Sequence, residues 1–408
     1  MSELAVLARI APFRWLALGT AISRLGSSIA PVALAFAVLD LTHSAASLGL
    51  VVGARSAATL VFLLIGGTLA DRVPRGILLA GSSVASAVTQ AIVGVTLLGH
   101  AETVPLLAGM SALNGAFSAL SGPAAAGLVP LTVSTELLPS ANAVSRLLSN
   151  AASVVGLAFA GIVVALIGSG GAIVVDAITF GVGAGCFALL RLDRSVRTTR
   201  AGFVRELLAG WTAFAERRWV WATVAAFFLA NAAFVGGIVV LGPTYADATI
   251  GRGAWGFFLA AEAVGYVAGG FIALRVRPRR YLAVGLVCAM AWSLPLFALA
   301  AHAPLPVLLA ASFAGGLGVE QFGVAWSTSL QEHVPIGLLS RVSSYDQLGS
   351  FLAIPIGQVL AGPVSLRLGL PVTLGAAGLL LVVALAGALC FAEVRGLRTT
   401  TREKTATG

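Results

Sequence analysis

Twelve apolar runs, each long enough to cross a bilayer at about 20 residues, divide this sequence. Backbone groups inside lipid must be paired within their own segment or in a closed barrel. Barrel strands alternate over about 10 residues, and these runs are longer and do not alternate. The sequence therefore predicts an all-α membrane protein with twelve transmembrane helices. The runs lie at Phe13–Leu39, Ala46–Leu69, Ile77–Leu98, Val104–Leu128, Ala141–Ile167, Ala172–Leu190, Trp219–Leu241, Ala254–Leu274, Leu282–Ala300, Val307–Leu330, Val342–Leu366 and Val372–Phe391.

The composition excludes a water-soluble fold. Of the 408 residues, 58% are hydrophobic and only 10% are charged, whereas soluble domains carry about 25% charged residues. So few polar side chains cannot cover a surface that faces water, but they suit one that faces lipid. The three cysteines are scattered singly in apolar runs and have neither disulfide nor metal spacing.

Arginines set the expected orientation in the membrane. Most basic residues lie in the links after even-numbered runs and at the two ends, and the links after odd-numbered runs hold only Arg252 and Arg367. Positive loops stay in the cytoplasm. We therefore expect a multi-pass protein of the cell membrane with both termini cytoplasmic. This distribution explains the net charge of +9 without nucleic-acid binding.

The longest link separates six runs from six. It carries Phe203, Leu207, Trp211 and Phe214 at helical spacing among arginines, which predicts an amphipathic helix on the inner membrane surface. A plain basic linker is the alternative. The expected division is an N-terminal half at residues 1–190, this linker at 191–218, a C-terminal half at 219–394 and a cytoplasmic tail at 395–408.

The two halves share a weak internal repeat. At an offset of 201 residues, Gly156 aligns with Gly357, and residues 160–161 align with residues 361–362. An offset that spans six runs keeps both copies in the same orientation, so the halves are expected to be related by an axis along the membrane normal. Chance similarity between helices rich in Gly, Ala and Leu is the alternative.

A charged stretch, GTLADRVPR at residues 67–75, interrupts the apolar sequence between the second and third runs. Pro74 and Gly76 favour a turn there. The stretch resembles the signature of the major facilitator superfamily, with Pro74 where the family usually has Gly. The resemblance implies two six-helix halves and a cytoplasmic gating motif in which Asp71 contacts the start of the eleventh helix near Arg341. The alternative is that Arg72 and Arg75 only anchor the orientation of the chain in the membrane. The motif residues are Gly67, Asp71, Arg72, Pro74 and Arg75.

Within that superfamily, three shorter stretches are similar to the macrolide-efflux and siderophore-export carriers. They are Ser23–Gly26, Leu137–Ala143 and Arg205–Trp211. Two features of proton-coupled drug antiporters are missing, namely an arginine in the fourth run and a Gly-Pro pair in the fifth.

Five ionisable residues within the runs are candidate coupling or cavity charges. A charge at mid-bilayer costs at least about 2.5–3.5 kcal/mol, so it normally faces a cavity or a partner. The three carboxylates among them are candidate proton carriers, because a buried carboxylate can bind and release a proton. We expect contacts of Arg55 with Glu262, and of Arg24 with Asp346 or Glu320; fixed ion pairs without transport chemistry are the alternative. The set is Arg24, Arg55, Glu262, Glu320 and Asp346.

Other polar residues in the runs are interpreted separately. Asp176 is expected to cap a helix or to lie at an interface. Four side chains could line a substrate path, although hydrogen bonds between helices would also explain them; they are Asn231, Gln321, Trp326 and Gln347. The histidines lack metal-ligand spacing and the chain has no P-loop, so no catalytic residue, metal or cofactor is predicted.

These observations predict a secondary active transporter rather than an enzyme. The expected activity is proton-coupled efflux of small amphipathic molecules such as drugs, macrolides or siderophores, by a monomer whose partners are its substrate, protons and membrane lipid. A nutrient or sugar importer of the same fold is one alternative. A membrane sensor that does not transport is another.

Overall fold

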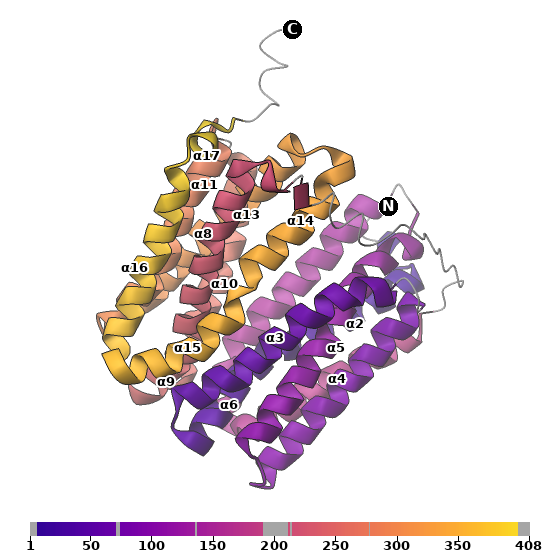
Figure 1. Cartoon of the computed structure of the whole chain (residues 1–408). Coiled ribbons are helices and arrows are strands. Elements are labelled where there is room, and N and C mark those ends of the chain that lie inside the picture. The colour runs from indigo at the N-terminus through magenta and orange to yellow at the C-terminus, as the bar shows by residue number, and fades with distance from the viewer. Residues whose placement is uncertain are drawn as a thin grey trace. The chain divides into compact units, whose positions relative to one another are not determined.

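The computed structural model describes residues 6–70, 74–134, 137–190, 211–212, 214–276 and 278–398, and within these ranges it contains helices and no strands (Figure 1). The first half of the chain forms α2 (Ala11–Thr42), α3 (Ala45–Ala70), α4 (Arg75–Leu98), α5 (Val104–Thr132) and α6 (Leu138–Ala188). The second half begins with α8 (Arg218–Val235), η2 (Gly236–Leu241), α9 (Gly242–Ala248), α10 (Arg252–Arg275), α11 (Tyr281–Ala289), η3 (Met290–Ser293) and α12 (Leu294–Ala300). It continues with α13 (Leu305–His333), α14 (Ile336–Phe351), α15 (Ala353–Leu368), α16 (Leu370–Leu389) and α17 (Ala392–Gly396).

The number of spans agrees with the sequence. In the described ranges, 11 helices are long and apolar enough to cross a membrane, and one of them covers Ser140–Ala188. That helix is broken at Gly168, where φ is 71° and ψ is 170°, so it holds both the fifth and the sixth predicted spans. The prediction of an all-α protein with twelve spans is confirmed.

Two glycines at the repeat offset make equivalent sharp junctions. Gly168 joins the fifth span to the sixth, and Gly369, which lies 201 residues later, joins α15 to α16 with φ 82° and ψ 154°. Only glycine adopts this backbone region without steric cost. The repeat detected in the sequence therefore recurs in the backbone geometry.

Close helix packing also follows the repeat. A Cβ atom added to Gly156 would lie 2.6 Å from the carbonyl oxygen of Leu25 on α2, and one added to Gly357 would lie 2.2 Å from the carbonyl oxygen of Ala232 on α8. In each half, the helix that carries the glycine thus approaches the first helix of that half at backbone distance.

Glycines at the same spacing do not all lie on a packed helix face. Gly265 of α10 does meet a neighbouring backbone, since its Cβ would lie 2.2 Å from the carbonyl oxygen of Phe313. Gly181 and Gly185, which have the same spacing in the sequence, face open space. Gly183 between them makes the close approach instead, since a Cβ atom added to it would lie 2.1 Å from the Ser23 hydroxyl oxygen of α2. Small-residue spacing alone does not identify the packed face.

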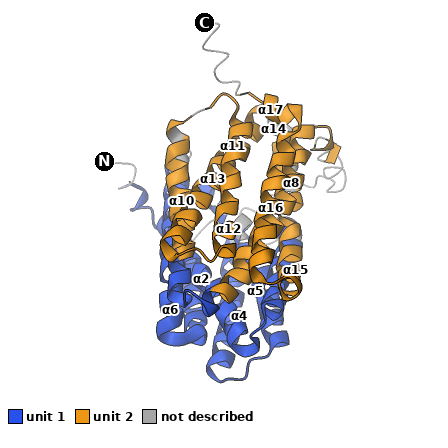
Figure 2. Cartoon of the chain, turned by 90° about the vertical axis from the view of Figure 1, so that its left-hand side faces the viewer, with its two compact units in different colours: residues 1–199, 246–257 blue, residues 200–245, 258–408 orange. Residues whose placement is uncertain are grey.

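The chain divides into two compact units, which Figure 2 colours separately. Unit 1 comprises Met1–Thr199 and Ala246–Phe257, and unit 2 comprises Arg200–Tyr245 and Phe258–Gly408. In unit 1, α2 packs along α6, and α3 and α4 pack along α5. In unit 2, α8 packs against α14, α15 and α16, and α11 packs against α13. The domain boundaries expected from the sequence remain a prediction.

Most of the expected amphipathic linker lies outside the described residues. At its end, Trp211 and Phe214 are described, and both rings pack on Tyr345 of α14 with centroid separations of 5.6 Å and 5.9 Å. The end of the link is thus attached to unit 2.

Candidate functional site

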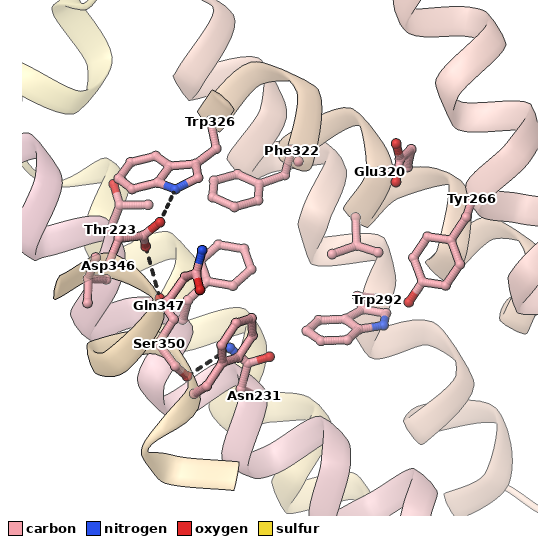
Figure 3. Close-up of a pocket in the computed structure, with 15 residues that line it drawn as sticks. Thr223, Asn231, Tyr266, Trp292, Glu320, Phe322, Trp326, Asp346, Gln347 and Ser350 are labelled. Carbon is pink, nitrogen blue, oxygen red and sulfur yellow. Dashed lines mark hydrogen bonds between the residues drawn. The ribbon is translucent and has the colours of Figure 1, made fainter. Parts of the chain in front are cut away.

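Unit 2 contains a cavity of about 300 Å³ (Figure 3). This volume lies at the lower end of the range for small-molecule sites. Side chains of α8, α10, η3, α13 and α14 line it, and most of them are aromatic, aliphatic or acidic. They are Thr223, Val224, Phe227, Asn231, Tyr266, Trp292, Val319, Glu320, Phe322, Gly323, Trp326, Asp346, Gln347, Ser350 and Phe351.

Two prolines account for the irregular backbone beside this cavity. Proline lacks an N–H and its ring disturbs the preceding turn of a helix. Pro295 follows the short 3₁₀ turn η3, which carries Trp292. Pro355 follows the interruption at Leu352 between α14 and α15. These distortions place Trp292 and the end of α14 at the cavity wall.

A buried amide stabilises the second distortion. Asn231 of α8 donates from Nδ2 to the carbonyl oxygen of Ser350 at 3.0 Å, in the turn where helical hydrogen bonding is interrupted. A buried carbonyl without a partner would cost about 1–3 kcal/mol. Asn231 therefore supports the wall of the cavity, and its amide nitrogen is already engaged.

An aromatic stack forms one side of the cavity. The rings of Phe227 and Phe322 stack with centroids 4.0 Å apart, and Phe322 and Trp326 are nearly parallel at 5.9 Å. The three side chains come from α8 and α13, so the packing of these helices fixes the ring faces. Flat, rigid rings suit an apolar or aromatic ligand.

Asp346 lies beside this stack and is held by two donors. Its carboxylate accepts hydrogen bonds from Trp326 Nε1 at 2.8 Å and from Ser350 Oγ at 3.3 Å. Both bonds are drawn in Figure 3. The carboxylate is thus fixed in orientation at one side of the cavity.

A second carboxylate, Glu262, lies behind the lining. Glu262 is only 8% exposed, and its Oε1 accepts hydrogen bonds from Tyr266 Oη at 2.9 Å and from Trp292 Nε1 at 3.1 Å. Both donors line the cavity, whereas Glu262 does not. Anything that moves Tyr266 or Trp292 therefore changes the surroundings of this buried acid.

Glu320 is the third carboxylate and differs from the other two. It projects from α13 into the lining, and Figure 3 places it near Tyr266, away from Asp346. Within the described residues, no hydrogen bond or ion pair engages its carboxylate. Its charge is available to a ligand.

Unit 1 contains a buried polar cluster around Asp176. Asp176 is fully buried inside α6, so it lies at a helix interface, one of its two expected positions, and not at a helix cap. It accepts hydrogen bonds from Gln90 of α4 and, at 3.5 Å, from Thr179. Arg55 of α3 interacts with it electrostatically. Because Gln90 lies 86 residues away in the sequence, spacing could not reveal the cluster.

The remaining predicted residues have varied surroundings. Arg24 of α2 donates from Nε to Ser153 Oγ at 3.1 Å. Gln321 donates to the carbonyl oxygen of Gly269, the helix–helix role considered as its alternative. The expected contacts of Arg24 and Arg55 with unit 2 carboxylates would join the two units, and they stay predictions.

The gating motif is described only in part. Pro74 precedes the first residue of α4, Arg75, and Gly67 lies in α3. Asp71 and Arg72 lie outside the described residues, so their role stays a prediction. In the described part of the chain, no three His, Cys, Asp or Glu side chains form a cluster that could hold a metal ion.

Arg252 is the centre of an ionic cluster in unit 1. From the sequence it was interpreted only as a basic residue in the link after an odd-numbered run. Its Nε donates to Asp247 at 2.8 Å, its Nη1 donates to Asp40 at the end of α2 at 2.9 Å, and its guanidinium lies 4.7 Å from the Phe36 ring centroid. The planar fork of arginine allows both acids to be bound at once.

The family model described as "Major Facilitator Superfamily" matches residues 16–345. The chain belongs to the major facilitator superfamily. The superfamily match and the helical spans show a multi-pass membrane transporter of small molecules rather than an enzyme. No curated protein is similar enough in sequence to identify a branch, so the resemblance to macrolide-efflux carriers is not confirmed.

Solved structures of transporters share this fold. The nucleoside transporter NupG is 13% identical, covers 93% of this chain and 98% of its own, and has a TM-score of 0.73. A bacterial homologue of the human lysosomal transporter Spinster, in an inward-facing and unoccupied conformation, is 15% identical with coverages of 96% and 98% and a TM-score of 0.73. At these identities the likeness establishes the superfamily fold and no substrate.

Proposed function

We propose that this chain is a proton-coupled exporter of small amphipathic molecules, and that the unit 2 cavity is its substrate site. It would work as a monomer in the cell membrane with both termini in the cytoplasm. The observation that supports this most is the combination, in one cavity, of an aromatic stack with two carboxylates. Such a lining suits a molecule with an apolar body and a polar end.

The cavity volume narrows the size of the substrate. At about 300 Å³, the site accommodates a compact molecule and is small for a macrocycle. Among the substrates considered from the sequence, compact drugs fit this site better than macrolides.

Glu262 supports proton coupling. Tyr266 and Trp292 both line the cavity and donate to this carboxylate. A substrate that contacts these two rings alters their hydrogen bonds to Glu262, and proton binding at Glu262 depends on those bonds. Substrate and proton are thereby linked through two side chains. Arg24 and Arg55 remain candidate cavity charges, and Gly67, Asp71, Arg72, Pro74 and Arg75 remain the proposed cytoplasmic gate.

Import of a nucleoside or sugar is the second candidate, favoured by the fold shared with NupG. Such a substrate presents several hydroxyl groups that require hydrogen-bond partners. Two polar groups of the cavity are already engaged, since Asn231 donates to Ser350 and the Thr223 hydroxyl donates to the Trp219 carbonyl at 2.8 Å. The lining therefore favours the amphipathic substrate.

A glycine in the lining allows a direct test. Gly323 lines the cavity, and a Cβ atom added to it meets open space. Gly323→Leu should therefore fold normally and fill the cavity. Gly387 of α16, which is exposed and also meets open space, provides Gly387→Leu as the matched control.

We expect cells that express the wild-type chain to resist some compounds in a toxicity panel. Gly323→Leu should abolish that resistance, and Gly387→Leu should retain it at equal expression. Accumulation assays with the same compounds distinguish export from import. Resistance that survives Gly323→Leu would remove the cavity as the substrate site.

A further inference from the structure

We infer that the unit 2 cavity selects organic cations, with the positive charge of the ligand at Glu320. This inference rests on the proposed substrate site and specifies the chemical class that the site takes. It depends on the charges, the hydrogen-bond partners and the ring faces of the lining residues.

The lining has only one sign of charge. Glu320 and Asp346 both face the cavity, and no Lys, Arg or His is among the described residues that line it. Glu262 adds a third acid directly behind Tyr266 and Trp292. Charges of like sign repel more strongly inside a protein than in bulk water. The lining therefore disfavours an anionic ligand and attracts a cationic one.

The three acids are not equivalent, and the difference identifies the binding group. Asp346 accepts two hydrogen bonds, and Glu262 accepts two. A cation that paired with either acid would compete with these donors. Glu320 has no hydrogen bond or ion pair to another described residue, so a ligand cation can pair with it without displacing anything. Pairing with a ligand cation also stabilises a partly buried carboxylate without a partner more than one that already accepts hydrogen bonds.

The aromatic lining complements a cation. Tyr266 lies near Glu320 at the same side of the cavity (Figure 3), and Phe322 of α13 stacks on Phe227 and Trp326. Ring faces attract ammonium and other organic cations as well as apolar surface. A compact aromatic cation can thus place its charge at Glu320 and its body on the ring stack.

Two probes of similar shape and opposite charge test this inference. 1-Methyl-4-phenylpyridinium is a permanent cation, and biphenyl-4-carboxylate is an anion of nearly the same size. Binding of each to the purified full chain in neutral detergent is measured by isothermal titration calorimetry at pH 7.5. We expect the wild type to bind the cation and not the anion.

Three variants locate the charge that is responsible. Glu320→Gln should weaken cation binding at least about tenfold, whereas Asp346→Asn should weaken it less because that carboxylate is already hydrogen-bonded. Glu393→Gln, at an exposed carboxylate of α17, is the matched control and should bind like the wild type. The unfolding temperature of each variant verifies that the fold is intact.

The inference is overturned if the anion binds as tightly as the cation, if neither probe binds, or if Glu320→Gln binds the cation like the wild type. These outcomes differ from a failure of the proposed function. Suppose that Gly323→Leu abolishes transport but the wild-type chain binds the cation no more tightly than the anion. The cavity then stands as the substrate site, and only the inference of cation selectivity is rejected. If Gly323→Leu transports normally, the substrate site itself is rejected.

Discussion

Asp176 in unit 1 and Glu320 in unit 2 are both carboxylates within membrane spans, but their surroundings are opposite. Asp176 is fully buried, accepts hydrogen bonds from Gln90 and Thr179, and lies within electrostatic reach of Arg55. Glu320 faces a cavity and has no hydrogen bond to another described residue. One acid completes a packed interior, and the other is available to a ligand.

The contrast extends to the helices around the two acids. In unit 1, α4 buries five polar side chains, namely Ser82, Ser83, Ser86, Thr89 and Gln90. In unit 2, the equivalent span formed by α11, η3 and α12 has one buried polar side chain, Ser293. The duplication thus kept the backbone features, such as the paired glycine junctions, while the polar chemistry diverged. This contrast supports the proposal that the substrate site lies in unit 2, whereas the buried polar residues of unit 1 pack its interior.

The largest expected effect is on the stability of unit 1. Asp176→Leu leaves the buried Gln90 amide without its acceptor, so the free energy of unfolding should fall by about 1–3 kcal/mol. Thermal unfolding of the purified chain in detergent measures this. Glu320→Gln should leave the unfolding temperature nearly unchanged. Equal destabilisation by both variants would contradict this contrast between the two units.

The next effect concerns coupling in unit 2. Glu262→Gln keeps the hydrogen-bond acceptor but cannot release a proton, so we expect transport driven by an imposed pH gradient to fall at least about tenfold. Substrate exchange at equal pH on both sides should continue. Proteoliposomes loaded with substrate measure both rates. Undiminished gradient-driven flux would exclude Glu262 as the coupling site.

A smaller effect is expected from the gating motif, which is also unequal between the halves. Residues 269–279 of the second half resemble residues 66–75, since both stretches begin with Gly-Gly and contain arginines around a proline. The first copy carries Asp71 next to Arg72, whereas this second copy has Leu274 next to Arg275. Because an acid at a helix N-terminus contributes about 0.3–1 kcal/mol, Asp71→Asn should lower the transport rate about two- to fivefold. Arg275→Gln, at an exposed position in the second copy, is the control and should transport normally. Wild-type flux in Asp71→Asn would reject the contact.

The smallest effect is expected at the ionic cluster of Arg252. Arg252→Lys keeps the charge but loses the fork that reaches Asp40 and Asp247 together. Since the Arg252 and Asp40 side chains are 28% and 51% exposed, the loss of unfolding free energy should be about 0.2–1 kcal/mol. A shift in unfolding temperature as large as that of Asp176→Leu would show that exposed and buried charges contribute alike.

The sequence predicted the all-α fold and its spanning helices well, because these follow from the length of the apolar runs. The internal repeat could be recognised from glycines at a constant offset. It also identified Asn231, Glu320, Trp326, Asp346 and Gln347, which all line the cavity. A polar side chain within a membrane span costs free energy, so such residues are rare in apolar runs and can be recognised in the sequence.

The aromatic lining could not be found in the same way. Phe227, Tyr266, Trp292 and Phe322 are apolar residues in apolar runs, and nothing in their spacing separates a cavity wall from a surface that faces lipid. Pro295 gave the best local signal, since a proline inside a span indicates a distorted turn. The hydrogen bonds of Asp176 and Glu262 to other helices depend on tertiary packing.

The glycine junctions at Gly168 and Gly369 have a practical consequence for engineering. At each of them the glycine alone links two spans, whereas Gly99–Thr103 separates α4 from α5 with a short loop. Inserted sequence is tolerated where the chain already has an exposed loop tip. An epitope tag should therefore be accepted at Ala101, whereas the same tag at Gly168 or Gly369 separates two directly joined spans and should lower the yield of folded protein.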